Sequence, residues 1–150
     1  MPKPQGYQDF RVYKANKQNS GSALQIDLNV EREAVFLEVS KQIAEQRFDW
    51  QNKLTIKLST TDIGKILSLL HGKTQGVKLF HDPGKGQYES SKEMKNNVLE
   101  MAKSPYGYSV KVSQQSSAGE LSSIGITVAE DEAIIMRMLL EKAIERIYNW

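Results

Sequence analysis

The chain has 150 residues, a formal net charge of +2 at pH 7 and no cysteine. Its length favours one domain with a substantial core, and its mild charge does not by itself indicate nucleic acid or an anionic membrane as a partner. The lack of cysteine excludes disulfides and thiolate metal sites such as zinc fingers. We find no apolar run of the roughly 18 residues that span a membrane and no signal or transit pattern at the N-terminus, so we expect a cytoplasmic protein.

Alternating apolar and polar residues predict half-buried antiparallel strands in the first half of the chain. Two of them cover residues 8–14 and 23–30, after a flexible tail at residues 1–6. The buried sides of the next two are marked by Val35, Leu37 and Val39 and by Leu54, Ile56 and Leu58. Ser59 and Asp62 then form a capping signal, and apolar residues recur at helical spacing until Gly72.

The second half repeats this order of strands and a helix. Strands are expected at residues 76–81, 98–104, 108–115 and 121–128, with a mobile loop at residues 84–97. Thr127 and Glu130 have the spacing of a capping box for a last helix that reaches about Tyr148. The pattern therefore predicts a two-part α+β protein.

The last helix carries apolar residues over more than the usual stripe of about 100°. A helix of this kind needs two surfaces to cover it, and we expect its own sheets to supply one and a second subunit the other. The alternative is a helix completely buried in one small core. The residues expected at the subunit interface are Ile135, Met138, Leu139, Lys142, Ile147 and Trp150.

The outward faces of the expected strands carry lysines with aromatic rings between them. Lysines that follow a phosphate backbone, with rings that stack on bases, are typical of a surface that binds single-stranded nucleic acid. The alternative is that the lysines are ordinary solvated charges and that the rings complete the core. The residues that form much of this pattern are Phe36, Lys53, Thr55, Lys57, Lys78, Phe80 and Lys111.

Catalytic and metal sites have little support in the sequence. His71 and His81 are the only histidines, and neither has a second ligand at metal spacing. Asp82 beside His81 is explained first by the Asp-Pro-Gly turn that it begins. There is no G-x-S-x-G, P-loop or dinucleotide motif, so we expect no enzyme activity, no metal and no cofactor.

Several of these segments together resemble the Whirly single-stranded-DNA-binding proteins. The segments are FDWQNKLTIKLSTTDIGKILSL, LFHDP, GYSVKV and ITVAEDEAIIMRMLLEKAIERIYNW, and they span almost the whole chain. The resemblance implies two antiparallel four-stranded sheets packed at a steep angle, each half ending in a helix. It is the fold of the single-strand-binding domain of positive cofactor four. It also implies a dimer or tetramer that assembles through the helices.

The chain departs from the plant members of that family in one motif. Plant members carry Lys-Gly-Lys-Ala after Val-Tyr, whereas Lys14-Ala15-Asn16-Lys17 follows Val12-Tyr13 here, so only Lys14 transfers from the resemblance. The N-terminus also lacks an organelle transit segment, which favours a bacterial or phage member. Such a member would be associated with the nucleoid.

The leading hypothesis is a non-enzymatic protein that binds single-stranded DNA with little sequence specificity, in recombination, replication, repair or transcription. The alternatives are an RNA-binding or annealing protein, and a transcriptional coactivator that acts mainly through protein partners. Phosphate contacts are expected from Lys14, Lys53, Lys57, Lys78, Lys111 and the loop residue Lys85. Rings or an apolar floor are expected from Phe36, Trp50, Phe80 and Tyr108, with Thr55 on the same surface.

Overall fold

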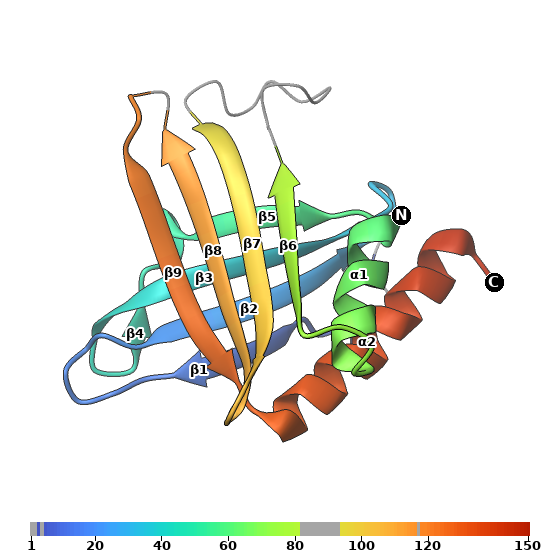
Figure 1. Cartoon of the computed structure of the whole chain (residues 1–150), viewed down its shortest axis with the longest axis horizontal. Coiled ribbons are helices and arrows are strands. Elements are labelled where there is room, and N and C mark those ends of the chain that lie inside the picture. The colour runs from blue at the N-terminus through green and yellow to red at the C-terminus, as the bar shows by residue number, and fades with distance from the viewer. Residues whose placement is uncertain (1–2, 4, 82–93, 117) are drawn as a thin grey trace.

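Two antiparallel sheets form the body of the protein, and each is followed by a helix (Figure 1). The computed structural model describes residues 3, 5–81, 94–116 and 118–150. The first half contains β1 (Phe10–Lys14), β2 (Ser22–Asn29), β3 (Ala34–Ala44), β4 (Arg47–Phe48), β5 (Leu54–Leu58) and α1 (Thr60–Leu70). The second half contains β6 (Gly76–His81), β7 (Met94–Ser104), β8 (Gly107–Ser116), β9 (Leu121–Val128) and α2 (Glu130–Tyr148). The predicted α+β class is confirmed.

Sheet 1 has the long strands in the order β1-β2-β3-β5. The two-residue strand β4 is an addition that alternation did not predict, and it pairs with the end of β3 across an irregularity between Gln42 and Ala44. A short 3-10 helix, Trp50–Asn52, then leads into β5. The FDW segment is therefore a turn structure that returns the chain to the sheet.

Sheet 2 has its strands in sequence order, β6-β7-β8-β9. The strand β7 begins at Met94, and Asn97 lies opposite His81 on β6. Residues 94–97 therefore belong to a strand and not to the expected loop, because Met94, Asn96 and Asn97 continue the ladder with β8. The rest of that expected loop, residues 84–93, lies outside the described residues.

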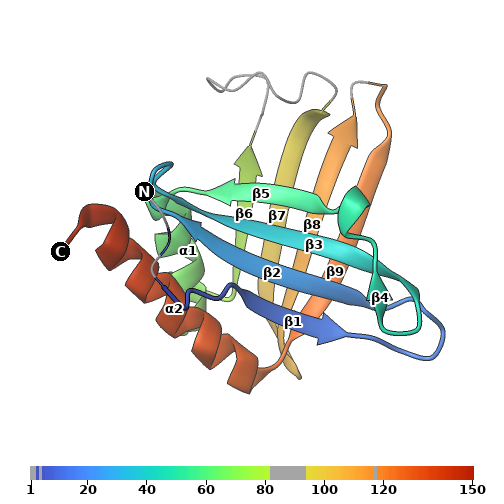
Figure 2. The ribbon, with the colours of Figure 1, turned by 180° about the vertical axis from the view of Figure 1, so that it is seen from behind.

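The strands of the two sheets cross at a steep angle, and the core lies between their inner faces (Figures 1 and 2). Leu24, Leu37 and Ile56 are fully buried on the inner face of sheet 1, and Leu99 and Val112 on that of sheet 2. At one edge, Ser22 Oγ donates a 2.7 Å hydrogen bond to the carbonyl oxygen of Gly125 on β9. This contact joins the end of β2 to the edge strand of sheet 2.

The start and end of α1 confirm the predicted signals. Asp62 N donates to Ser59 Oγ at 3.3 Å, and Ser59 N donates to Asp62 Oδ2 at 3.0 Å, which completes the capping box. Gly72 has a φ of +78°, a value that glycine adopts without a steric penalty, and its N–H bonds to the carbonyl oxygen of Leu69. The helix packs through buried Ile63 and Ile66.

The start of α2 differs from the predicted capping box. Ala129 is the N-cap residue, and its N–H donates to Glu132 Oε1 at 2.8 Å. Thr127 is still in β9, so the box predicted from Thr127 and Glu130 is wrong by two residues. The error arose because a β-strand with hydroxyl side chains runs directly into the helix.

One face of α2 covers the core, and another carries exposed apolar side chains. Ala133, Met136, Leu140 and Ala143 are buried. On the other face, Ile134, Ile135, Met138 and Leu139 are exposed, with 61% of Met138 accessible. The alternative of a helix buried completely in one core is therefore wrong for the single chain.

Candidate nucleic-acid interface

Sheet 2 faces the viewer in Figure 1, and the register of its strands arranges the residues of its outer face in rows. In the middle row, Lys78 lies opposite Glu100, which lies opposite Lys111, which lies opposite Gly125. The next row toward the helices has Gly76, Ala102, Ser109 and Thr127. The side chains of this second row are all small or carry a hydroxyl group. They form a low floor beside the longer side chains of Lys78 and Lys111.

An open groove of about 1150 Å³ crosses this face, and we call it the lysine groove. Three of the predicted lysines, Lys14, Lys78 and Lys111, line it. Lys14 comes from the end of β1 in the other sheet, and Gly21 and Ser22 at the start of β2 join it on that side. The groove thus collects residues that are far apart in the sequence and that the strand pattern alone could not place together.

The lysines of the groove have carboxylate neighbours. Lys14 Nζ lies 2.7 Å from Glu132 Oε1 in the first turn of α2, and Lys78 Nζ lies 3.6 Å from Glu100 Oε1. The Lys78–Glu100 pair is the more exposed of the two, and an exposed pair of this kind stabilises a fold by only about 0–1 kcal/mol.

Phe80 and Tyr106 are the exposed rings of this region. Phe80 is on the outer face of sheet 2 beside the groove, next in line to Lys78 on β6, and 62% of it is exposed. Tyr106 lines the groove from the turn between β7 and β8 and is 82% exposed. Gly107 allows this turn, because its φ is +136° and a Cβ there would lie 2.2 Å from the carbonyl oxygen of Val128.

The sequence predicts Tyr108 as a ring or part of an apolar floor for bases, and the structure places its side chain in the core. Tyr108 is 7% exposed and lies on the inner face of sheet 2, on the same side of β8 as Val110 and Val112. Lys103 covers its ring, with Nζ 4.7 Å from the ring centroid. The two-residue alternation with Val110 and Val112 is the signal in the sequence that assigns Tyr108 to the core.

Phe36, Thr55 and Lys57 of the predicted surface lie in sheet 1, which is in front of sheet 2 in the view of Figure 2. Phe36 lies opposite Lys57, and Glu38 lies opposite Thr55. Lys53 pairs with Glu38, which also accepts hydrogen bonds from Gln25 at 3.1 Å and from Thr55 at 3.3 Å. The structure therefore divides the predicted residues between two faces and does not bring them into one surface.

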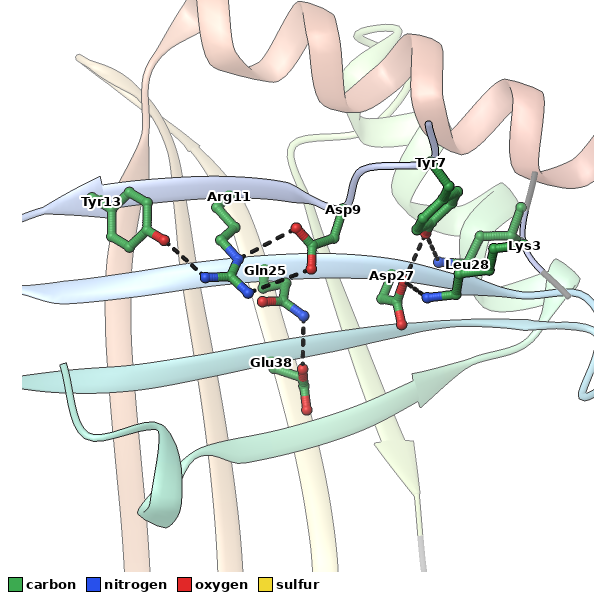
Figure 3. Close-up of polar contacts among 9 residues, drawn as sticks. All are labelled: Lys3, Tyr7, Asp9, Arg11, Tyr13, Gln25, Asp27, Leu28 and Glu38. Atoms are coloured by element: carbon green, nitrogen blue, oxygen red, sulfur yellow. Dashed lines mark hydrogen bonds and ion pairs between the residues drawn. The ribbon is translucent and has the colours of Figure 1, made fainter. Parts of the chain in front are cut away.

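Acidic and basic side chains form ion pairs on the outer face of sheet 1 (Figure 3). Asp9 pairs with Arg11, whose NH1 group donates to Tyr13 Oη at 3.1 Å. Asp27 pairs with Lys3, so part of the N-terminal segment expected to be a flexible tail contacts the sheet. Lys3, Arg11 and Lys53 on this side of the protein are therefore each paired with a carboxylate.

Tyr7 is the most perturbed titratable group in this network. Its hydroxyl donates to Asp27 Oδ1 at 2.6 Å and accepts the N–H of Leu28 at 2.8 Å. Burial, followed by the hydrogen bond to Asp27, raises the pKa of Tyr7 from 10.0 to about 12. The folded state thus favours the neutral phenol.

Tyr7→Phe is expected to remove an ionisation step near pH 12 from an ultraviolet absorbance titration. Because the pKa is higher in the folded state, the stabilising contribution of Tyr7 is complete below pH 10 and disappears as the pH rises through 12. The stability difference between the wild type and the variant should therefore shrink over this range. Tyr106→Phe is the control, and loss of the step in that variant would contradict the assignment.

A second group of rings lies at the end of sheet 1. The ring centroids of Tyr13 and Phe48 are 5.4 Å apart, and the guanidinium carbon of Arg11 lies 5.4 Å from the Trp50 ring. A hollow of about 420 Å³ lies among Tyr13, Phe48 and Trp50. Trp50 is therefore placed beside a cation and a cavity, but not beside Lys78 or Phe80.

The histidines have structural partners. His81 Nε2 lies 3.0 Å from Asp62 Oδ2 at the start of α1, and His71 Nε2 lies 3.2 Å from Glu141 Oε1 on α2. Among the described residues, we find no group of His, Cys, Asp or Glu that could hold a metal ion. Within the same residues, no helix has the length and apolar character needed to cross a membrane. Asp82 and Lys85 lie outside the described part of the chain.

A comparison with family models gives an independent result for this chain. The model of the Whirly family, described as a transcription factor family, matches residues 12–139. The chain belongs to the Whirly family. The resemblance seen in the sequence is thus confirmed across both sheets and the first half of α2.

Curated relatives in this Whirly family come from plants. The single-stranded DNA-binding protein WHY1, chloroplastic, of Zea mays is 33% identical over 119 residues, which cover 69% of this chain and 43% of the relative. The single-stranded DNA-binding protein WHY2, mitochondrial, of Arabidopsis thaliana is 24% identical, with 72% of this chain and 45% of the relative covered. The chain spans less than half the length of these two relatives.

Solved structures have the same fold. The crystal structure of WHY3 from Arabidopsis thaliana has a TM-score of 0.78 at 21% identity and covers 99% of this chain and 92% of that chain. A guide-RNA-binding protein complex bound to a guide RNA has a TM-score of 0.62 at 16% identity, with 97% and 93% covered. At these identities the likeness concerns the fold alone, and it includes the two crossed four-stranded sheets that the sequence predicted.

Proposed function

We propose that this Whirly-family chain is a non-enzymatic protein that binds single-stranded DNA with little sequence specificity. The observation that carries the proposal is the convergence of Lys14, Lys78 and Lys111 on one groove. The names of the plant relatives, which describe single-stranded DNA-binding proteins, support it. The groove offers positive charge for the backbone, and Phe80 and Tyr106 at its margin offer rings for bases.

In the proposed complex, the ammonium groups of the three lysines contact phosphates, and the low floor of the groove lets the strand approach the sheet. Gly76 and Gly125 have no side chain, and Ser109 and Thr127 have short ones with hydroxyl donors. Such contacts do not depend on base identity, and stacking tolerates every base because each base has a π-face. These backbone and stacking contacts therefore give low sequence specificity.

RNA is the second candidate ligand, because the guide-RNA-binding complex has the same fold. A competition experiment separates the two ligands. Labelled oligothymidine bound to the protein is displaced with unlabelled DNA or RNA strands of equal length and sequence. Displacement at lower concentration by DNA supports the proposal, whereas displacement at lower concentration by RNA would assign the groove to RNA.

We also propose that the protein self-associates through the exposed face of α2. Ile135, Met138, Leu139, Lys142 and Trp150, all predicted at the interface, are exposed, and Trp150 is 99% accessible. Ile147 is the exception, because it is half-buried against the protein's own core. A contiguous apolar face of this kind is typical of an interaction surface.

Met138→Glu is expected to dissociate this assembly without unfolding the chain. The substitution puts a charge where the second subunit would exclude water, while the exposed site in the single chain tolerates it. Light scattering should then give a mass close to the 17.0 kDa of one chain. Ile43→Glu, an equal change at an exposed residue of β3, is the control. An unchanged mass for Met138→Glu would contradict the proposed interface.

The family description and the names of the relatives bear on the pathway and the compartment. The family description names transcription, which is one of the pathways expected from the sequence. The relatives are named as chloroplastic or mitochondrial proteins, whereas the sequence led us to expect a cytoplasmic, nucleoid-associated protein. Binding to DNA of a nucleoid type, in a bacterium or an organelle, is common to these settings.

A further inference from the structure

Glu100 is the acidic residue that lines the lysine groove, and no other acid is among its described lining residues. Its carboxylate projects from β7 between Lys78 on β6 and Lys111 on β8, which lie directly opposite it on either side. Neighbouring strands are about 4.8 Å apart, so the two lysine positions are separated by about 10 Å with the carboxylate between them. The charges of Lys78, Glu100 and Lys111 in the middle row are therefore positive, negative and positive in turn.

This alternation constrains what can lie at each position. Phosphate oxygens accept hydrogen bonds and carry negative charge, so they will lie at Lys78 or Lys111 and avoid Glu100. An ionised carboxylate only accepts hydrogen bonds. The part of a bound strand that lies over Glu100 must therefore present a donor.

The bases differ in whether they can do this. Cytosine and adenine carry an exocyclic amino group, and guanine has both an amino group and a ring N–H. A carboxylate can accept a hydrogen bond from each of these groups. Uracil and thymine offer one N–H that lies between two carbonyl oxygens, which the carboxylate repels. Glu100 is only partly exposed, with 46% of its side chain accessible, so solvent does not cancel this difference completely.

We propose that Glu100 is a specificity-determining residue that makes the lysine groove prefer bases with an exocyclic amino group. The inference rests on the proposed binding of single-stranded DNA to this groove. Lys78 orients the carboxylate in the unbound protein, at 3.6 Å, and exchanges it for a phosphate when a strand binds. The released carboxylate then accepts a hydrogen bond from the amino group of the base.

The test compares oligodeoxycytidine with oligodeoxyuridine of equal length, at mildly alkaline pH where cytosine strands do not pair with themselves. These strands share the same sugar and phosphates and differ at the base edge that faces Glu100. Fluorescence anisotropy should give about 5-fold tighter binding of the cytosine strand by the wild type. Glu100→Gln should bring this ratio close to 1, because an amide can donate as well as accept.

The ratio is the decisive quantity, because removing any negative charge from the protein will raise the affinity for both strands. Glu33→Gln is the matched control, at an exposed residue of the turn between β2 and β3, and it should keep the 5-fold preference. A wild-type ratio close to 1, or a ratio that Glu100→Gln leaves unchanged, would overturn the inference while binding of both strands upholds the proposed function. Absence of binding to either strand would overturn both.

An RNA arm separates the base from the sugar, since a 2′-hydroxyl is also a donor. Oligouridine should bind no more tightly to the wild type than oligodeoxyuridine does. If instead oligouridine gains affinity and Glu100→Gln removes that gain, Glu100 reads the sugar and the amino-group preference is wrong.

Discussion

Replacing Lys14, Lys78 and Lys111 together with glutamine is expected to lower the affinity for single-stranded DNA about 100-fold at low salt. Each lysine that neutralises a phosphate releases condensed counterions, which provides much of the binding free energy. The slope of log K against log salt should become shallower by about 2, since each lost contact removes about 0.7 on a single strand. Fluorescence anisotropy with oligothymidine at several salt concentrations measures both quantities.

The matched control replaces Lys53, Lys57 and Lys65 with glutamine, which removes the same charge. Lys53 and Lys57 belong to the outer face of sheet 1, and Lys65 is exposed on α1. This variant should keep most of the affinity and most of the salt slope. If it loses more than the groove variant, the strand lies on sheet 1 and the proposed groove is wrong.

Leu37→Ala is expected to lower the free energy of unfolding by about 3 kcal/mol. Leu37 is fully buried in the centre of sheet 1, between Ile26 on β2 and Ile56 on β5. Its removal leaves a cavity that the crossed sheets cannot close, because side chains from both sheets and helices fix its walls. Urea denaturation followed by circular dichroism, at one protein concentration, gives the change.

Leu121→Ala is the control for this change, because the same side chain is 70% exposed at the start of β9. Its effect should remain within about 0.5 kcal/mol. Equal effects of the two substitutions would contradict the assignment of the core. The folded fraction of Leu37→Ala should still bind DNA, since Leu37 is on the inner face.

The sequence predicts most of the strands, because one face of each sheet is exposed to solvent and the other is buried. In such strands, period-two alternation marks the buried side, and Val35, Leu37 and Val39 lie where it placed them. The prediction failed where polar residues stay in a ladder, as at Asn96 and Asn97 in β7, and where a bulge adds the short strand β4. Alternation carries no information about either event.

The candidate site was less predictable, because it depends on which faces point the same way. Alternation identified Lys57 and Lys78 as outward residues, but outward means opposite directions for the two crossed sheets. The position of Lys14 in the groove depends on the crossing itself, which brings the end of β1 to the edge of sheet 2. Tyr106 lies in a turn, where alternation does not apply, and only the resemblance to the family related Lys14 to binding.

The central claim is that the lysine groove binds single-stranded DNA, and a salt titration of binding to poly-dT and to duplex DNA of equal length tests it most directly. Light scattering run in parallel fixes the number of subunits in the complex. We predict tighter binding of poly-dT at every salt concentration, with log K falling by about 2 per tenfold increase in salt for three phosphate contacts in each subunit. Equal affinity for the duplex, or affinity for poly-dT that does not change with salt, would contradict the claim.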